Sequence, residues 1–365
     1  MNILICSIHL ENSYSGGRYH SWIMTEALAS AGHMVTGWTN NYPYYAKEFK
    51  ELNNEINIIV DPLFEKKITE KYDCVIIVPH QGDGFNFYEK SLKIAKESSA
   101  KLILLNFESP NWYNSMVEPN RDESLWDGWV MVSQYADMVL SLTKISTQYA
   151  KKFYTNGSKK LIFTECYPGI NSTVADNVKQ VSREKKILCL TRFIKTDSHK
   201  GGYLIDEILK DKRLTGYTFT LIVGNGGTDK EYISNLESVA KDNNINLKLL
   251  SLLDDAEKFQ EMKSSQALLF MSKFEGFGYP PVEALYLGTP VVAFDLPVLR
   301  EVNGDKINYV EEDNFSSIVS EILKTENFKD GERDNLTNAV EDVALFEAYI
   351  TRLEQKLSLL FDGKK

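Results

Sequence analysis

Two carboxylates, Glu275 and Glu283, stand eight positions apart on either side of a glycine turn, Gly276-Phe277-Gly278. The apolar run 266–271 predicts a buried strand before them, and Pro280-Pro281 predicts the start of a helix. Glycines allow a backbone to approach a ligand closely, and the start of a helix favours an anion. Carboxylates repel phosphate but accept hydrogen bonds from hydroxyls. The pattern therefore indicates a ligand with hydroxyls on both sides of a phosphate, as in a nucleotide-sugar.

The same stretch resembles the signature of a known family. Glu275 and Glu283, with the glycines between them, are similar to the E-x7-E signature of GT4-type (group 1) retaining glycosyltransferases of the GT-B fold. Residues 288–293 resemble that family's helix-to-strand turn, and 167–171 resemble its P-G-I-D element, where the chain crosses between domains. The resemblance implies that Glu283 binds ribose hydroxyls and that Glu275 contacts and orients the donor sugar. Taken singly, Glu275 also fits a solvated loop residue, and Glu283 a favourable charge in the helix's first turn.

Two cations at predicted strand ends suit the same ligand. Arg192 follows the predicted strand 186–190, and Lys200 precedes Gly201-Gly202. A leaving nucleoside diphosphate gains negative charge, which preorganised cations and a helix dipole stabilise. In the family that the chain resembles, an arginine and a lysine at these places bind the donor diphosphate, and a glycine loop such as 223–227, with Gly224, passes near the nucleotide. The candidate catalytic residues are therefore Glu275, Arg192 and Lys200.

The first half of the chain carries further candidates. Ser15-Gly16-Gly17-Arg18 lies at the switch from the first strand to the first helix. The family's Gly-Gly loop at this place lies against the donor diphosphate, although such a pair also fits a simple turn. His80 and Glu108 follow two other predicted strands, at the edge where open α/β sheets bind ligands. The family has a histidine near the second place, so Glu108 departs from its pattern. Trp112-Tyr113 is the candidate for stacking on an acceptor sugar.

Short apolar runs alternate with helical periods along the chain. Strands are expected at 3–8, 34–38, 56–60, 73–78, 101–106, 137–142, 160–164, 186–190, 217–223, 246–250, 266–271 and 290–294, and helices at 18–31, 201–209, 229–240, 256–262 and 339–360. This alternation predicts α/β architecture with mostly parallel sheets covered on both faces.

Length predicts two domains. The resemblance implies the GT-B fold: an acceptor-binding Rossmann-like domain (1–175) and a nucleotide-sugar-binding Rossmann-like domain (176–335) that face each other across a cleft. Residues 171–184 are polar and aperiodic, as a linker would be. A C-terminal helix (336–365) is expected to cross back to the first domain, and a dimerising helix is the alternative.

Composition narrows the function classes. The chain of 365 residues has a net charge of −10, which argues against non-specific nucleic-acid binding, and its apolar runs are too short to span a membrane. Four cysteines without metal-ligand spacing indicate buried free thiols in a cytoplasmic protein. A local cluster of lysines fits a solvated helix face or, alternatively, peripheral contact with the anionic inner surface of the membrane. Its members are Lys144, Lys151, Lys152, Lys159 and Lys160.

These patterns together predict an enzyme. The resemblance implies a glycosyltransferase that moves a sugar from a nucleotide-diphosphate sugar to a hydroxyl of a glycan, lipid-linked or small-molecule acceptor, with retention of anomeric configuration. No Asp-x-Asp element stands at a strand end with a partner carboxylate, so neither a metal nor another cofactor is expected. The alternatives are a sugar-nucleotide epimerase or phosphorylase of the same fold, and a non-catalytic two-domain binding protein. The last of these would have less need for both cations and both glutamates together.

Overall fold

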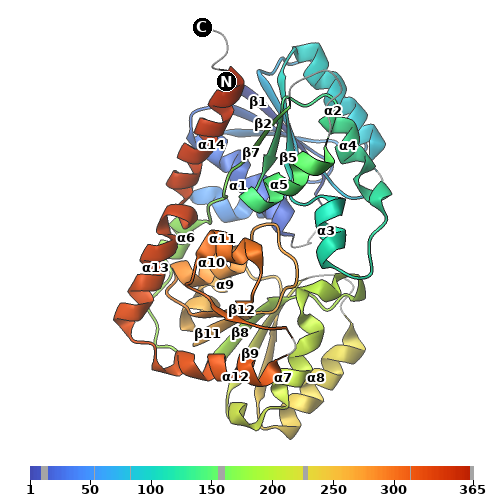
Figure 1. Cartoon of the computed structure of the whole chain (residues 1–365). Coiled ribbons are helices and arrows are strands. Elements are labelled where there is room, and N and C mark those ends of the chain that lie inside the picture. The colour runs from blue at the N-terminus through green and yellow to red at the C-terminus, as the bar shows by residue number, and fades with distance from the viewer. Residues whose placement is uncertain are drawn as a thin grey trace. The chain divides into compact units, whose positions relative to one another are not determined.

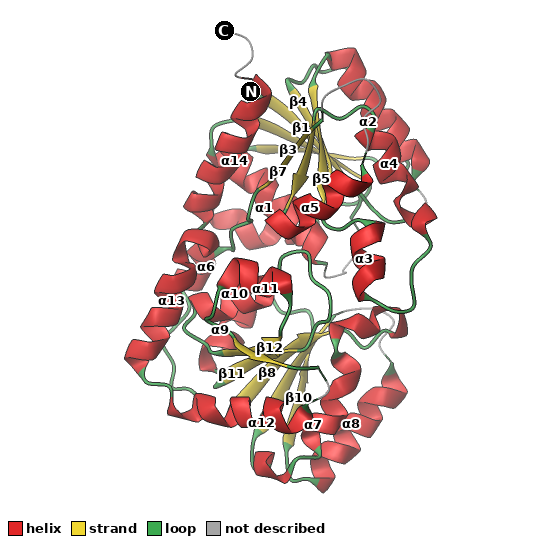
Figure 2. Ribbon diagram, viewed as in Figure 1, coloured by secondary structure: helices red, strands yellow, loops and turns green. Residues whose placement is uncertain are grey.

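The computed structural model describes residues 1–9, 15–52, 54–82, 84–154, 161–224, 229–312 and 314–361. The chain divides into two compact units: Met1–Gly169 with Phe346–Lys365, and Ile170–Leu345 (Figure 1). Each unit has its own parallel sheet, whose strands are short, apolar and covered by helices (Figure 2). The predicted α/β fold with two parallel sheets is thereby confirmed. In the described part of the chain, every helix is too short or too polar to cross a lipid bilayer.

The first unit holds seven parallel strands in the order β3-β2-β1-β4-β5-β6-β7. The direction of strand addition reverses between β1 and β4, and open α/β sheets bind ligands at the carboxyl edge of such a point. The strands are β1 (Asn2–Ser7), β2 (Met34–Thr39), β3 (Ile56–Val60), β4 (Cys74–Ile77), β5 (Lys101–Asn106), β6 (Met138–Ser141) and β7 (Ile162–Glu165). The α-helices are α1 (Gly16–Ser30), α2 (Phe85–Ser98), α3 (Pro110–Met116), α4 (Asp127–Ser133), α5 (Lys144–Phe153) and α14 (Phe346–Phe361), which packs on α1.

The second unit holds six parallel strands in the order β10-β9-β8-β11-β12-β13, with the reversal between β8 and β11. The strands are β8 (Lys186–Thr191), β9 (Thr218–Val223), β10 (Asn246–Leu250), β11 (Ala267–Phe270), β12 (Val291–Phe294) and β13 (Asn308–Val310). The α-helices are α6 (Ser172–Asp176), α7 (Ile205–Leu209), α8 (Lys230–Asp242), α9 (Asp255–Ser264), α10 (Tyr279–Tyr286), α11 (Pro297–Asn303), α12 (Phe315–Lys324) and α13 (Asp330–Ala344). One face of the sheet packs against α7, α8 and α12 in a single apolar core.

The division between the units falls after Gly169, a few residues before the expected position 175. The segment expected to be a linker (171–184) is in part structured, because Ser172 and Ala175 of α6 are buried in the second unit. Polar side chains at the surface of a short helix produce the same aperiodic pattern as a linker. Composition alone therefore does not distinguish the two.

The prediction of one continuous helix at 339–360 is wrong, because the structure has two helices there, α13 and α14. Leu345 leaves the helical conformation with ψ of 132° and separates α13 from α14. The two helices also belong to different units, since α13 packs on α10 and α14 packs on α1. The buried stripe of α14 consists of Phe346, Tyr349, Leu353, Leu357 and Leu360, with Ile350 only half-buried.

Candidate active site

The candidate site of the second unit lies where the order of its strands reverses. β8 and β11 are neighbouring parallel strands, so Arg192 and the loop 272–278 follow their carboxyl ends at the same edge of the sheet. The chain leaves β8 toward α7 and leaves β11 toward α10. Ligands of open α/β sheets bind in the crevice at this kind of position. The structure therefore brings together residues that are about 80 positions apart in sequence.

Lys200 and Glu275 form an ion pair at this edge. The Nζ atom of Lys200 lies 2.9 Å from Oε1 of Glu275 and donates a second hydrogen bond to the Phe274 carbonyl at 3.2 Å. The side chains are 26% and 15% exposed, so the pair is partly dehydrated and still reachable by solvent. A solvated loop residue would not be held in this way. Glu275 thus has a fixed orientation before any ligand binds.

Backbone geometry explains why Lys200 lies beside this loop. Gly201 has a φ of +73°, and a Cβ atom there would overlap the carbonyl oxygen of Met271, at the end of the β11 strand. Only glycine permits this approach. The amide of Lys273 then donates to the His199 carbonyl at 2.7 Å. The segment before Gly201 is therefore tied to the loop that carries Glu275.

Arg192 is held by a second ion pair at the same edge. Its Nη1 atom lies 3.0 Å from Oδ2 of Asp197, with side-chain exposures of 31% and 17%. Gly224 lies beside it, and a Cβ atom there would be 3.4 Å from Cγ of Arg192. Residues 225–228 of the expected glycine loop lie outside the described residues. Both predicted phosphate-binding cations, Arg192 and Lys200, are thus half-buried and ion-paired with a carboxylate. An anionic ligand would have to compete with these carboxylates for the two cations.

The helix that follows begins one residue earlier than its prolines suggest. Gly278 caps α10 with a φ of +90°, where a Cβ atom would lie 2.7 Å from Leu299, and Tyr279 is the first helical residue. Pro280 and Pro281 have no N–H group. Fewer backbone donors are therefore available in the first turn of α10 than at an ordinary helix start. An anion here would depend on the loop amides and on Arg192 and Lys200.

The sequence predicts Glu283 in the first turn of α10, and this prediction is wrong. The helix starts at Tyr279, and its first turn holds no acidic residue. Its side chain is fully buried, and its Oε1 accepts a hydrogen bond from Nζ of Lys258 at 2.8 Å. Its Oε2 has no hydrogen-bond partner among the described residues. Burial raises the pKa of Glu283 above its usual value, although Lys258 opposes this shift. A favourable interaction between a charge and the start of a helix therefore does not explain the position of Glu283.

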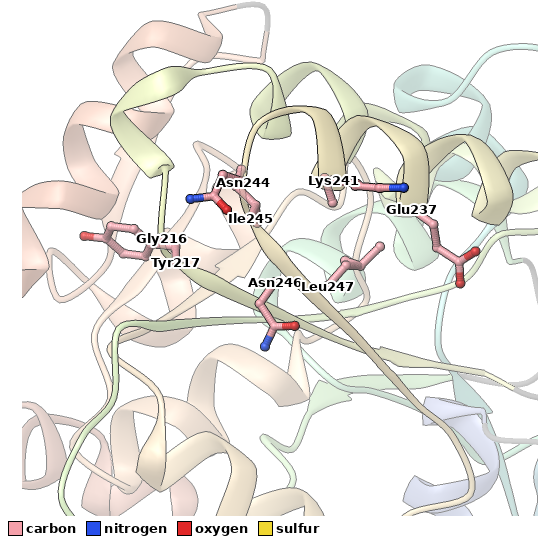
Figure 3. Close-up of a pocket in the computed structure, with 9 residues that line it drawn as sticks. Gly216, Tyr217, Glu237, Lys241, Asn244, Ile245, Asn246 and Leu247 are labelled. Atoms are coloured by element: carbon pink, nitrogen blue, oxygen red, sulfur yellow. The ribbon is translucent and has the colours of Figure 1, made fainter.

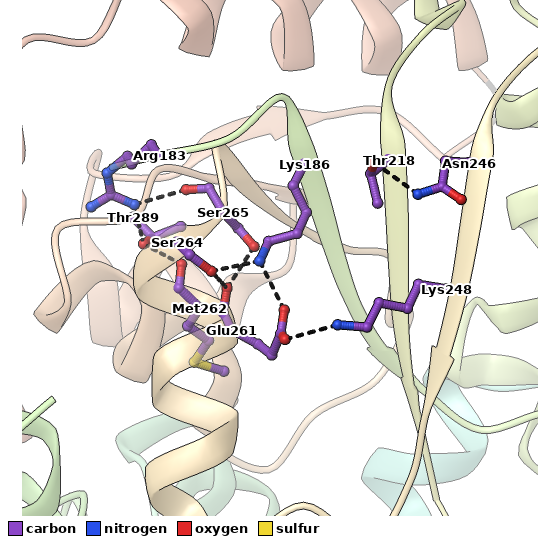
Figure 4. Close-up of polar contacts among 10 residues, drawn as sticks. All are labelled: Arg183, Lys186, Thr218, Asn246, Lys248, Glu261, Met262, Ser264, Ser265 and Thr289. Carbon is purple, nitrogen blue, oxygen red and sulfur yellow. Dashed lines mark hydrogen bonds and ion pairs between the residues drawn. The ribbon is translucent and has the colours of Figure 1, made fainter. Parts of the chain in front are cut away.

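The far end of α10 is held by an arginine that the sequence analysis does not single out. Arg183 donates to the carbonyl of Ser265 at 2.8 Å and to Oγ1 of Thr289 at 2.7 Å (Figure 4). It also donates to the carbonyl of Gly288 at 2.7 Å. Gly288 follows the end of α10, Ser265 follows the end of α9, and Thr289 precedes β12. An arginine in a polar segment gives no sequence signal for such a role, because its acceptors lie about 80 to 105 residues away in sequence.

In the first unit, the candidate polar residues gather at the carboxyl ends of β4 and β5. Gln81 joins Glu108 to Arg121, since its amide donates to Glu108 and its carbonyl accepts from Nη1 of Arg121 at 3.1 Å. His80 is half-buried, and its Nδ1 has no hydrogen-bond partner among the described residues. Burial, and then the charge of Arg18, lower the pKa of His80, so its imidazole is neutral at pH 7.

Gly16 and Gly17 are the first two residues of α1, at the reversal point of the first sheet. A Cβ atom at Gly16 would have no neighbour within 4 Å, and one at Gly17 would make an ordinary contact of 3.5 Å with the ring of Phe107. Packing among the described residues therefore requires neither glycine. The loop 10–14 that precedes them lies outside the described residues.

Trp112 and Tyr113 are packed inside the first unit. Trp112 is 4% exposed and stacks on Tyr149 with ring centroids 5.6 Å apart, and Tyr113 is 2% exposed with Arg121 over its ring. Neither ring presents a face for an acceptor sugar in this structure. Aromatic residues after a strand serve cores and sugar sites alike, so their sequence position does not separate the two roles.

The lysine cluster lies in part on α5. Lys144, Lys151 and Lys152 are exposed on that helix, with Lys152 over the ring of Tyr149 at 5.5 Å, whereas Lys159 and Lys160 lie outside the described residues.

The four cysteines, Cys6, Cys74, Cys166 and Cys189, are buried free thiols. Among the described residues, no group of three or more His, Cys, Asp and Glu side chains is placed to hold a metal ion.

A pocket of about 480 Å³ lies away from these residues, at the amino ends of β9 and β10 (Figure 3). Its lining includes Tyr217 and Asn246, which precede and begin those strands, and Glu237 and Lys241 of α8. In open parallel sheets, the loops that bind ligands follow the carboxyl ends of the strands, at the opposite edge of the sheet. This pocket is therefore not part of the candidate site.

Residues 173–342 match the family of glycosyl transferases group 1. The second unit of the chain is therefore a group 1 glycosyltransferase domain. The O-antigen chain mannosyltransferase RfbU of Salmonella typhimurium is 33% identical over 196 residues. This match covers 53% of the chain and 52% of that protein, so the chain spans about half the length of this curated relative.

Two solved structures have the same fold over the full chain. Sucrose-phosphate synthase from Thermosynechococcus elongatus has a TM-score of 0.70 at 15% identity, with 100% of both chains covered. The pneumococcal O-GlcNAc transferase GtfA, in complex with UDP and GlcNAc, has a TM-score of 0.69 at 13% identity, with 99% of both chains covered. These likenesses assign the chain to the GT-B fold.

Proposed function

We propose that this protein transfers a sugar from a nucleoside diphosphate-sugar to an acceptor hydroxyl with retention of anomeric configuration. The observation that carries the proposal is the Lys200–Glu275 ion pair at 2.9 Å, which lies with Arg192 at the strand-order reversal of a group 1 glycosyltransferase domain. Cations for a diphosphate and a carboxylate for hydroxyls stand side by side there. A nucleotide-sugar carries both kinds of group within a few bonds of each other.

The roles of the residues follow from where charge develops in the reaction. When the bond to the anomeric carbon breaks, negative charge grows on the leaving diphosphate, and Lys200 and Arg192 stabilise it. Glu275 accepts hydrogen bonds from the donor sugar and holds it for attack from the face that the diphosphate leaves. Glu283 accepts from the ribose through Oε2, the oxygen that Lys258 leaves unpaired. Positioning and leaving-group stabilisation supply the catalysis, without a strong base.

The acceptor is proposed to be a glycan or glycolipid, by likeness to the O-antigen chain mannosyltransferase. The polar cluster of His80, Gln81, Glu108 and Arg121 in the first unit is the candidate for its binding. Four buried free thiols support work in the reducing cytoplasm. The exposed lysines of α5 suit contact with an anionic membrane surface that presents a lipid-linked acceptor.

A nucleoside diphosphate is expected to raise the melting temperature of the protein, whereas the nucleoside alone has little effect, because Arg192 and Lys200 act on the phosphates. A thermal-shift screen with UDP, GDP, ADP and their nucleosides measures this, and incubation of the parent protein with UDP-, GDP- and ADP-sugars then shows which donor is consumed. Equal stabilisation by the nucleoside and the diphosphate would overturn the assignment of the phosphate site.

Transfer is also expected to continue in EDTA at an unchanged rate. In the proposed reaction Arg192 and Lys200 stabilise the charge that the leaving diphosphate gains, and this is the task that a divalent ion would otherwise have. Initial rates with and without EDTA, and with added Mg²⁺ or Mn²⁺, measure the effect. Loss of activity in EDTA that either metal restores would show that a metal ion, and not the two side chains alone, stabilises the leaving group.

A further inference from the structure

Four buried polar side chains form a connected network next to the candidate site. Nζ of Lys258 donates to Oδ1 of Asp255 and to Oε1 of Glu283, both at 2.8 Å, and Nδ2 of Asn171 donates to Oδ2 of Asp255 at 3.1 Å. None of the four residues is more than 4% exposed. Asp255 and Lys258 lie one turn apart on α9, and Glu283 comes from α10. The network therefore fixes the candidate ribose-binding carboxylate to a second helix.

The network leaves one oxygen without a donor. Lys258 occupies Oε1 of Glu283, while Oε2 is buried and has no hydrogen-bond partner among the described residues. When all are ionised, Asp255, Lys258 and Glu283 together carry one net negative charge. A buried carboxylate oxygen without a donor destabilises a protein, so its persistence suggests that a ligand supplies the missing donor. A hydroxyl is a suitable donor, because it brings a proton and no charge.

We propose that Lys258 is a positioning residue for the donor: it holds Oε1 of Glu283 so that Oε2 is left to accept hydrogen bonds from the ribose hydroxyls. This inference rests on the proposed function, in which Glu283 binds the ribose. Lys258 touches no substrate itself. It fixes the direction of the carboxylate and favours its ionised form, which accepts stronger hydrogen bonds than the neutral acid. Because Glu283 is fully buried, the ribose reaches Oε2 only after the groups over it shift, and the ion pair holds the carboxylate in place meanwhile.

The chain offers a matched control for this lysine. Lys186 is 5% exposed, like Lys258, and its Nζ lies 2.8 Å from Oε2 of Glu261 and 2.5 Å from Oγ of Ser264 (Figure 4). It begins β8, at the end of the strand opposite to Arg192. Lys186→Met and Lys258→Met each remove one buried, ion-paired ammonium group from the same unit. A general loss of packing or stability would therefore affect both variants.

The test compares each variant's affinity for a nucleoside diphosphate and for its 2′,3′-dideoxy analogue by calorimetry. The probe is whichever of UDP, GDP and ADP stabilises the parent protein most. We expect the parent to prefer the ribose form about tenfold or more, since hydrogen bonds to a charged group are strong. In Lys258→Met the preference should fall to near one, mostly through weaker binding of the ribose form. Lys186→Met should keep the parent's preference.

The outcomes separate this inference from the proposed function. If Lys258→Met keeps the parent's preference, Lys258 does not position Glu283, although the nucleotide site stands. If the parent binds the diphosphate without any preference, the ribose role of Glu283 is wrong and the inference falls with it. If none of the three diphosphates binds, both the proposed function and the inference are overturned.

A second variant guards against failure of Lys258→Met to fold. That substitution leaves two carboxylates buried without their ammonium group, which is strongly destabilising. Asp255→Asn/Lys258→Met removes the second carboxylate as well and leaves only Glu283 charged, while the amide that replaces this carboxylate can still accept a hydrogen bond from Asn171. The same loss of preference is expected, and Asp255→Asn alone, which retains the Lys258–Glu283 pair, should keep it. Loss of preference in Asp255→Asn alone would overturn the assignment to Lys258.

Discussion

Lys200→Ala is expected to lower kcat/KM for sugar transfer by about 100- to 1000-fold, the range found when one preorganised donor to a developing negative charge is removed. The substitution has two effects that act in the same direction. It removes a cation from the leaving diphosphate. It also leaves Glu275, which is only 15% exposed and 2.9 Å from Nζ of Lys200, as an unpaired negative charge beside the same phosphates.

Steady-state kinetics with saturating acceptor measures this loss, and Lys248→Ala is its matched control. Lys248 lies in the same unit and also pairs with a half-buried glutamate, Glu261, at 3.2 Å, but on β10 and away from the site (Figure 4). That variant should retain the parent's activity. If Lys200→Ala loses no more than Lys248→Ala, the lysine is a structural surface residue and takes no part in transfer.

The double variant Lys200→Ala/Glu275→Gln tests the ion pair itself. If the two side chains act as a unit, removal of the second costs less once the first is gone, so the losses in kcat/KM are not multiplicative. Donor affinity should also recover in part relative to Lys200→Ala, because no unpaired carboxylate then remains near the diphosphate. Fully multiplicative losses would mean that the contact seen in the structure has no part in the reaction.

Glu275→Gln is expected to lower kcat about 10- to 100-fold and to leave donor affinity near that of the parent. Glutamine keeps the size of the side chain and its hydrogen bond with Lys200, and removes only the charge. The donor sugar gains positive charge at its anomeric carbon as the bond breaks, so a carboxylate near its hydroxyls is worth more in the transition state than in the ground state.

Glu283→Gln is the variant with which the kcat and donor affinity of Glu275→Gln are compared. A contact with the ribose changes little as the glycosidic bond breaks, so its loss should weaken donor binding with a smaller effect on kcat. Lys258 still pairs with Asp255 in that variant, at 2.8 Å, so the net charge of the network changes from −1 to zero and the protein should fold. Normal donor affinity with low kcat in Glu283→Gln, and the reverse in Glu275→Gln, would mean that the two roles are exchanged.

The sequence predicted the strands β1 to β12 and the loop of the candidate site well, and missed only β13 among the described strands, because the responsible signals are local. Short apolar runs between helical periods define buried parallel strands at nearly their observed positions. Gly201 and Gly278 have φ values of +73° and +90°, which favour glycine for a reason that lies in their own backbone, and Gly201 directly follows Lys200. Arg192 and Lys200 were singled out from the family resemblance and from their places after a strand and before a glycine, and their part in binding phosphate stays a prediction.

Only the tertiary structure decided which partners these residues have. Lys258 reaches Glu283 across 25 residues, and Arg183 reaches Gly288 across 105, because α9 and α10 pack together and strand order brings distant loops to one edge. Nothing in the local pattern around Lys258 distinguishes it from a solvated helix lysine. The full burial of Glu283, and its place beyond the first turn of α10, likewise became visible only in the folded structure.

The last helices show the same limit on a larger scale. The period of apolar residues through 339–360 continues across Leu345, so the sequence predicts one helix where the structure has two that belong to different units. A periodic pattern records which face of a helix is buried, but not the core that buries it. Trp112 and Tyr113 illustrate the converse, since their residue types suit a sugar site and a core alike, and packing placed both rings in the core. Local chemistry therefore determined what each residue is able to do, and the fold determined which of them meet.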